Sequence, residues 1–288
     1  MAGSRDEVRG GGWRAKIGAD LPLRAATAVT LMILGLGAAW VGGFSFLAFW
    51  LVGSALVAWE WQRLVGGERR WMRVGVAVLA LVAASPFALR GEAIRACFVL
   101  VVGAVATGAL ADRPRRIWAA AGVVYAGALV VGVTLLRASP AYGLAAILWL
   151  FAVVWGTDVM AYFGGRRFGG PKLWPSVSPG KTWSGAIVGV VAGALFGAIV
   201  AEVAAPGGAR FLPMLMLGLA ASVVSQLGDL FESAMKRRAG AKDSSGLIPG
   251  HGGLMDRLDG FIAATAFAAV LAGVRSSGAW IAGGLFQW

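Results

Sequence analysis

The sequence predicts an all-α, polytopic integral membrane protein with about nine transmembrane helices. Three observations support this prediction: the composition, the spacing of the apolar runs and the placement of the basic residues. The 288-residue chain is 58% hydrophobic and 14% charged, whereas ordinary globular domains contain roughly 25% charged residues. Its single cysteine, Cys97, lies inside an apolar run, which excludes a disulfide-bonded scaffold. The solvent that suits such a chain is a lipid bilayer.

Nine apolar stretches divide the chain, and most approach the roughly 20 residues that cross a bilayer as a helix. The third and fourth are short, so a tilted pair and a hairpin that does not fully span both fit their length. In order, the stretches are 25–42, 44–62, 74–89, 96–111, 117–136, 141–163, 183–205, 211–228 and 260–281. Residues 1–20 are polar and glycine-rich. They are expected to form a disordered cytoplasmic tail, without the apolar core of a cleaved signal peptide.

The basic residues determine the predicted orientation. With a cytoplasmic N-terminus, 21 of the 26 lysines and arginines lie in cytoplasmic segments and 5 lie in outer segments. This bias follows the positive-inside rule, so the N-terminus is predicted to be cytoplasmic and the C-terminus to lie outside. The basic clusters alternate with apolar runs, so the net charge of +12 does not indicate a nucleic-acid partner. The predicted location is the cell inner membrane or plasma membrane.

The two halves of the chain differ in character. Region 21–140 has few polar groups within its runs and is expected to anchor the protein; Glu60 is interpreted as a residue at the membrane interface. Region 141–288 is expected to be the catalytic transmembrane region, with cytoplasmic loops at 164–182 and 229–259. These loops are rich in glycine and basic residues, a combination that suits anion binding by backbone N–H groups.

The segment 222–259 contains the residues that indicate chemistry. Its acids that could bind a metal are Asp229, Asp243, Asp256 and Asp259, and basic side chains lie between them. Mg²⁺ typically takes one or two carboxylates and fills its other positions with water and phosphate oxygens. Asp229 directly follows an apolar run, where an unpaired acid is costly and by default functional. The sequence therefore predicts a site for Mg²⁺ and phosphates, with a second metal ion left open.

The same segment resembles the signature of a known family, the phosphatidate cytidylyltransferases (CDP-diacylglycerol synthases). The similar run is Ser233-x-x-Lys236-Arg237-x4-Lys242-Asp243-x-x-Gly246-x-x-Pro249-Gly250-His251-Gly252-Gly253-x-x-Asp256-Arg257-x-Asp259. Upstream, the residues around Asp158 and the run Ser178-Pro179-x-Lys181-Thr182 also resemble motifs of that family. One departure is Ser184, where many members carry glutamate, so Ser184 is not assigned to the site.

The resemblance implies a Mg²⁺-dependent membrane enzyme of phospholipid biosynthesis. It would transfer CMP from CTP to phosphatidate, giving CDP-diacylglycerol and pyrophosphate, with the active site facing the cytoplasm. The implied partners are CTP, phosphatidate and the bilayer, and a homodimer is left open. Asp158 is expected to orient a cation such as Lys181.

The resemblance also implies roles for individual residues. Asp229 and Asp256 are the first metal ligands, with Asp259 and Asp243 assigned to a second ion or an outer position. His251 either donates a hydrogen bond or only shapes its turn. The side chains implied to act on phosphates are Lys181, Lys236, Arg237, Lys242, His251 and Arg257; those implied to bind substrate or cofactor are Ser178, Thr182, Ser233, Gly252 and Gly253.

Three other functions remain as alternatives. A related membrane enzyme that activates a different lipid phosphate with CTP would have a similar catalytic loop. An anionic-solute transporter would also explain Asp229 and the glycine-rich segments, but without CTP turnover. A CDP-alcohol phosphotransferase would show Asp-Gly-x2-Ala-Arg. Asp259-Gly260 begins that pattern here, but Ala263-Ala264 follows where Ala-Arg is required.

Overall fold

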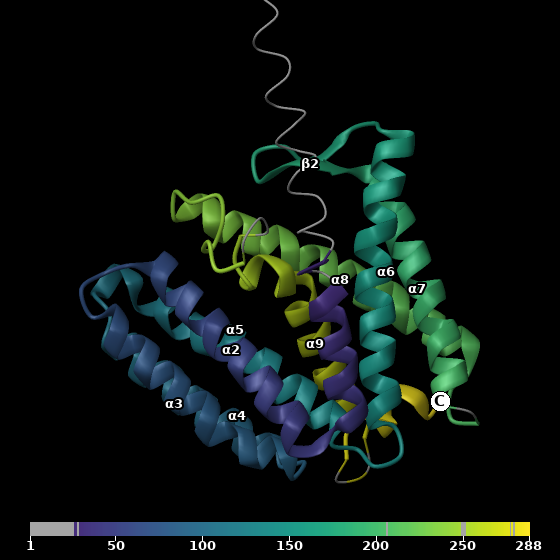
Figure 1. The fold of residues 1–288 in the computed structure, drawn as a ribbon, viewed down its shortest axis with the longest axis horizontal. Helices are drawn as coiled ribbons and strands as arrows, with labels where there is room; N and C mark the ends of the chain where they lie inside the picture. The colour runs from purple at the N-terminus through teal and green to yellow at the C-terminus, as the bar shows by residue number, and fades with distance from the viewer. Residues whose placement is uncertain (1–25, 28, 206, 249–251, 277, 279) are drawn as a thin grey trace, which may run out of the picture.

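The computed structural model describes residues 26–27, 29–205, 207–248, 252–276, 278 and 280–288, and most of them are helical (Figure 1). The predicted tail 1–20 and His251 lie outside the described residues. A helix at Val29–Val41 comes first. The elements that follow are α2 (Gly43–Val65), α3 (Arg70–Leu89), α4 (Ala93–Ala109), η1 (Arg113–Arg115), α5 (Arg116–Arg137), α6 (Gly143–Phe168), β1 (Lys172–Trp174), β2 (Ser178–Thr182), α7 (Trp183–Ala204), α8 (Phe211–Arg238), α9 (Met255–Arg275) and α10 (Gly283–Phe286).

Each of the nine predicted apolar stretches lies on a helix in the described part of the chain. Seven of the described helices are long and apolar enough to cross a membrane. The two shorter ones are Val29–Val41 and α4. The third stretch is longer than predicted, because α3 begins at Arg70 and reaches 20 residues. The helical membrane architecture is therefore confirmed.

Both segments expected to be loops contain regular structure. α8 continues through ten residues beyond the apolar stretch 211–228, because Asp229–Arg238 consists largely of good helix formers and its last turn is basic. Gly240, with φ 67°, follows the end of the helix. In the segment 164–182, β1 and β2 pair as an antiparallel hairpin. This hairpin departs from the all-α prediction, and the polar loop between α8 and α9 is shorter than predicted.

The helices form two groups that meet at α9. α2 to α5 pack on one another, α6 packs closely on α7, and α9 contacts both α8 and α5 (Figure 1). Stacked aromatic rings join three of the helices: Phe261 on α9 lies 5.1 Å from Trp50 on α2 and 5.4 Å from Phe151 on α6, measured between ring centroids. The start of α9 is therefore held from both sides.

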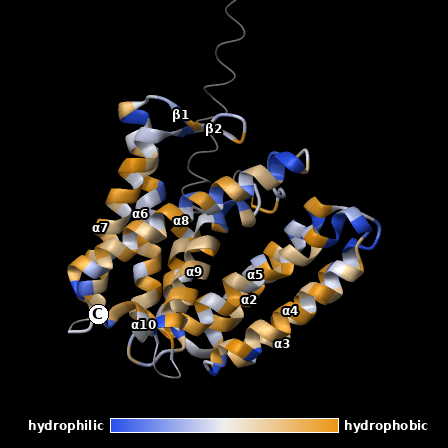
Figure 2. Cartoon of the chain, turned by 180° about the vertical axis from the view of Figure 1, so that it is seen from behind, coloured by the Kyte–Doolittle hydropathy of each residue, from blue (hydrophilic) through white to orange (hydrophobic). Residues whose placement is uncertain are grey.

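The polar connections gather toward one end of the bundle. Those that follow α2, α4, α6 and α8 lie toward this end, and those that precede α4, α6 and α8 lie toward the other (Figures 1 and 2). The hydrophilic colouring of Figure 2 is strongest at the α2–α3 turn and at the end of α8. The long polar segments of the second half thus share one end with the basic turns of the first half.

Gly228 allows α8 and α9 to cross closely. A Cβ atom at this position would lie 2.9 Å from the carbonyl oxygen of Asp259 on α9. We therefore expect Gly228→Ala to destabilise the protein by about 1–3 kcal/mol, because the helices would have to separate. Gly75→Ala in α3 is the matched control, since no described atom lies within 4 Å of its added Cβ. Apparent Tm in detergent is the measurement, and an unchanged Tm for Gly228→Ala would contradict the close crossing.

Candidate active site

The crossing of α8 and α9 brings two predicted metal ligands together. Asp229 follows Gly228 on α8, and Asp259 precedes Gly260 on α9. A Cβ at Gly260 would lie 3.1 Å from the carbonyl oxygen of Ser225, so both helices need glycine at the contact. Asp229 and Asp259 are close enough to interact electrostatically. The small residues beside the acids thus explain how the two carboxylates become neighbours.

A cation from the β-hairpin completes this cluster. Lys181 Nζ on β2 lies 2.5 Å from Asp229 Oδ2, and about a third of each side chain is exposed. Asp158 on α6 interacts electrostatically with Asp229, Lys181 and Arg257. Asp158 was expected to orient Lys181; the ion pair of Lys181 is with Asp229, and Asp158 interacts electrostatically with both. Asp158, Lys181, Arg257 and the neighbouring acids Asp229 and Asp259 form the group named here the crossing cluster.

A second ion-pair group lies where α8 ends. Lys236 Nζ is 2.7 Å from Glu232 Oε2 and 2.7 Å from Asp256 Oδ1. The exposed fractions of the three side chains are 12%, 0% and 5%. The backbone N–H of Ser244 donates to both oxygens of Asp256, at 3.2 and 3.1 Å, and that of Gly253 donates to Oδ2 at 2.8 Å. Asp256 therefore joins the end of α8, the loop and the first turn of α9.

The loop before α9 is folded around Asp256. Ile248 N–H donates to the carbonyl oxygen of Gly252 at 2.8 Å, which closes the turn. Gly252 has φ +84°, a backbone conformation that favours glycine, and an added Cβ there would lie 2.8 Å from Asp256 Oδ2 and 3.6 Å from Asp243 Oδ1. Asp243 and Asp256 therefore both lie close to Gly252, while the predicted role of His251 falls outside the described residues.

Three residues predicted to bind substrate make contacts within the protein. The hydroxyl of Thr182 accepts a hydrogen bond from Gly185 N–H at 3.2 Å, so it caps the start of α7. Ser233 Oγ lies 3.4 Å from Asp229 Oδ1. Ser178 begins β2. These contacts place all three near the crossing cluster or its supporting hairpin.

The remaining predicted cations lie on the surface at the same end. Arg237, Lys242 and Arg257 are exposed. Within the described residues, neither the Arg237 nor the Lys242 side chain makes a hydrogen bond or ion pair, whereas Arg257 interacts with Asp158. Exposed cations beside buried ion pairs are suited to meet an anionic ligand arriving from water.

Sequence reasoning missed three polar residues of this region. Glu232, which was not assigned to the site, is buried against Lys236. Tyr125 on α5 has a buried hydroxyl without a hydrogen-bond partner among the described residues, and it interacts electrostatically with the acids of both groups. Glu60 is fully buried within the protein, a burial that its interpretation as an interface residue did not predict. The sequence signal for Glu60 is an acid within an apolar run.

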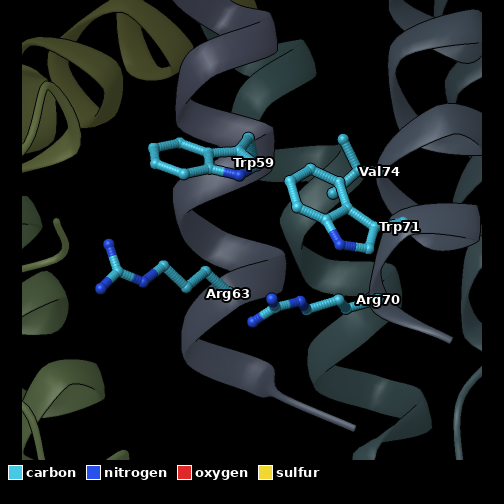
Figure 3. A pocket seen from close by; sticks show the side chains of 5 residues that line it. All are labelled: Trp59, Arg63, Arg70, Trp71 and Val74. Carbon is cyan, nitrogen blue, oxygen red and sulfur yellow. The ribbon is translucent and has the colours of Figure 1, made fainter. Parts of the chain in front are cut away.

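A cavity of about 310 Å³ lies apart from these groups, between α2 and α3 (Figure 3). It is lined by Trp59, Arg63, Arg70, Trp71 and Val74, and none of these is a predicted site residue. Each arginine lies over an indole ring, Arg63 over Trp59 at 5.9 Å and Arg70 over Trp71 at 5.4 Å. The guanidinium group of Arg63 points away from Trp71, so the two cations do not converge (Figure 3).

The donor set of the crossing cluster is compatible with Mg²⁺. Among the described residues, no three acidic, histidine or cysteine side chains form a metal-binding group by themselves. Mg²⁺ does not need such a group, because substrate phosphates and water supply most of its ligands. Asp229 and Asp259 provide two neighbouring carboxylates, whereas both oxygens of Asp256 accept backbone hydrogen bonds.

These observations define a polytopic helical membrane protein with clustered carboxylates and lysines at one polar end. The chain belongs to the cytidylyltransferase family: the family model described as "Cytidylyltransferase family" matches residues 22–274. The chain is 42% identical over 257 residues to the phosphatidate cytidylyltransferase of Brucella abortus (strain 9-941), and the match covers 86% of this chain and 91% of that protein. It is 37% identical over 270 residues to the one from Pseudomonas aeruginosa, covering 87% and 97%. The resemblance inferred from the motifs is therefore confirmed.

Proposed function

We propose that this protein transfers CMP from CTP to phosphatidate, producing CDP-diacylglycerol and pyrophosphate for phospholipid biosynthesis. The observation that carries the proposal is the crossing cluster, in which segments far apart in the sequence bring acids and cations together at one polar end of the bundle. Membership of the cytidylyltransferase family and the names of the two relatives support the same reaction.

The chemistry requires charge neutralisation more than proton transfer. An oxygen of the phosphatidate phosphate attacks the α-phosphorus of CTP, and the bond to the bridging oxygen of the β-phosphate breaks. The second pKa of a phosphomonoester is about 6, so the attacking group is largely dianionic at neutral pH and needs no strong base. Cations must offset the repulsion between two polyanions and stabilise the departing pyrophosphate.

The basic residues of the site are suited to this task. Lys181 and Lys236 are each paired with a carboxylate, so each is held in place as a compact charge near the reacting phosphates. Exposed Arg237, Lys242 and Arg257 would bind the pyrophosphate or the lipid phosphate, since guanidinium groups contact phosphate in a bidentate manner. The lipid's acyl chains would remain among the apolar helices.

Mg²⁺ is part of the proposal. Asp229 and Asp259 would hold it, and Asp256 would fix the loop beside them. The sequence prediction instead had Asp229 and Asp256 as the first ligands, with Asp259 assigned to a second ion or an outer position. When bound, Mg²⁺ neutralises phosphate oxygens of CTP and stabilises the leaving pyrophosphate. Lys181, held beside Asp229, would contact a substrate phosphate. A second ion, Asp243 as one of its ligands and a homodimer stay predictions from the sequence.

The orientation in the membrane is also proposed. Nine spans, a cytoplasmic N-terminus and an outer C-terminus would place all four polar connections of the site end in the cytoplasm, where CTP is found. The concentration of basic residues at that end supports this orientation. α4, with 17 residues, would extend about 26 Å at 1.5 Å per residue, close to the roughly 30 Å of the hydrocarbon core.

The test is CMP transfer by the purified protein in detergent micelles. With CTP labelled at the α-phosphate and phosphatidate, label is expected in CDP-diacylglycerol. EDTA should abolish the transfer, and added Mg²⁺ should restore it. Transfer that persists fully in EDTA would contradict the role of the metal. Turnover only with a polyprenyl phosphate would indicate the related lipid-activating enzyme, and solute flux without CTP turnover would indicate the transporter.

A further inference from the structure

Glu60 lies in the last two turns of α2 and reaches into the catalytic loop. Its side chain is 0% exposed. It accepts hydrogen bonds from the hydroxyl of Ser245 at 2.5 Å, from Leu254 N–H at 2.9 Å and from Met255 N–H at 2.6 Å. All three donors are at least 185 residues away in the sequence. One carboxylate of the first half thus binds both the middle of the loop that precedes α9 and the start of α9 itself.

These contacts replace a local helix cap. The N-cap residue of α9 is Leu254, whose side chain has no oxygen to accept a bond from the first turn. The first N–H groups of a helix need acceptors and are stabilised by negative charge. Glu60, which lies on a different helix, supplies both the acceptors and the negative charge. Its Oε1 accepts from Leu254 N–H and its Oε2 from Met255 N–H.

The contacts of Glu60 flank those of Asp256. Met255, bonded to Glu60, directly precedes Asp256, and Ser245, also bonded to Glu60, directly follows Ser244, whose N–H donates to Asp256. Gly253 lies between the two carboxylates. Its N–H donates to Asp256, and an added Cβ would lie only 2.5 Å from Glu60 Oε1. Any displacement of Glu60 would therefore move the donors that orient Asp256.

The end of α2 is itself firmly held. Trp61 Nε1 donates to the carbonyl oxygen of Trp118 at 2.7 Å, and Gln62 Nε2 donates to that of Ala119 at 2.8 Å. Both acceptors lie on α5, so the residues that follow Glu60 are fixed to the first helix group. The first half of the chain thereby provides a rigid support for Glu60.

We propose that Glu60 is a positioning residue for CMP transfer, which caps α9 from α2 and holds Asp256 and its loop in the reactive arrangement. The proposal rests on the proposed function for its activity assay. It gives the first half of the protein a part in catalysis beyond anchoring. Gly253 is needed at this position, because the side chain of any larger residue would clash with both Ser244 Oγ and the Glu60 carboxylate.

The test compares Glu60→Gln with Glu92→Gln, the same change in a glutamate that is paired with Arg95 at the other end of the bundle. Glu60→Gln keeps the shape but turns an NH₂ group toward backbone donors, so kcat per folded protein is expected to fall at least tenfold, with KM for CTP changed less than threefold. Glu60→Asp, which keeps the charge, should recover part of kcat. Glu92→Gln removes the ion pair between Glu92 and Arg95 at the start of α4, away from the loop before α9, and is expected to leave kcat per folded protein unchanged. A kcat for folded Glu60→Gln within twofold of wild type would overturn the proposal.

Hydrogen–deuterium exchange tests the proposal without activity. In Glu60→Gln, amides 244–248 and 252–256 should exchange at least tenfold faster, with α3 and α4 unchanged; exchange equal to wild type in these amides would overturn the proposal. If Glu60→Gln does not fold, Ser245→Ala takes its place, with a threefold or larger loss of kcat expected and an unchanged kcat overturning it. A wild-type protein that lacks CMP transfer would refute the proposed function, whereas the exchange result would still decide the role of Glu60.

Discussion

Asp256→Asn is expected to lower kcat for CMP transfer by about 100-fold or more. The carboxylate accepts bonds from Lys236, from Ser244 N–H and from Gly253 N–H, and its side chain is only 5% exposed. An asparagine has one acceptor oxygen and turns its NH₂ group toward these donors. Leaving buried donors unsatisfied costs about 1–3 kcal/mol each, so Tm should also fall. The loop would lose the contact that joins α8 to α9.

The matched control is Asp112→Asn. Asp112 also forms an ion pair, with Arg115 at 2.8 Å, but its side chain is 64% exposed. Exposed ion pairs contribute little to stability, so this variant should keep both Tm and kcat. Steady-state CMP transfer and thermal unfolding in detergent measure both variants. Near-normal kcat for folded Asp256→Asn would contradict the proposal that Asp256 holds the loop in its reactive arrangement.

Asp229→Asn is expected to lower kcat by about 100-fold or more and to raise the Mg²⁺ concentration needed for half-maximal rate. Asp229 is paired with Lys181 at 2.5 Å and neighbours Asp259 at the helix crossing. Removing the charge of Asp229 takes away one of the two proposed Mg²⁺ ligands. Lys181 also loses the partner that holds it in place. Metal sites lose roughly 10–100-fold in affinity even when only a supporting residue is removed.

Glu202→Gln is the control for Asp229→Asn. Glu202 is an exposed acid near the end of α7, at the opposite end of that helix from Lys181 and the hairpin. Its removal changes the net charge of the protein equally, but it should leave the Mg²⁺ dependence unchanged. If both variants shifted the Mg²⁺ dependence alike, the effect would come from overall charge, and the assignment of Asp229 would be wrong.

The helices were predictable because the bilayer imposes a simple requirement. Each apolar run must satisfy its own backbone hydrogen bonds, so run length and hydropathy locate the helices directly. The residues at which the helices begin and end were less predictable. The extension of α8 through Glu232 to Arg238 follows from helix propensity, but its polar composition resembles a loop. The hairpin of β1 and β2 has no strong alternation of apolar and polar residues to indicate it.

The site was predictable in its residues but not in its pairings. The motifs identified Asp229, Asp256 and the lysines, because these residues lie in compact polar segments. Which lysine pairs with which acid depends on packing between segments: Lys181 and Asp229 are brought together only by the fold. The contacts of Glu60 show most clearly what could not be predicted from the sequence. Glu60 lies near the end of an apolar run, and only the position of a loop 185 residues away explains its burial.

The most direct test of the account is the binding of Mn²⁺, in place of Mg²⁺, to the purified protein with CTP, followed by electron paramagnetic resonance. Asp229 and Asp259, at the crossing of α8 and α9, are proposed to hold a divalent cation together with the nucleotide. Wild-type protein should bind Mn²⁺, and Asp229→Asn and Asp259→Asn should each weaken that binding at least tenfold, while Glu202→Gln should not. Equal Mn²⁺ affinity in all four proteins would contradict the account.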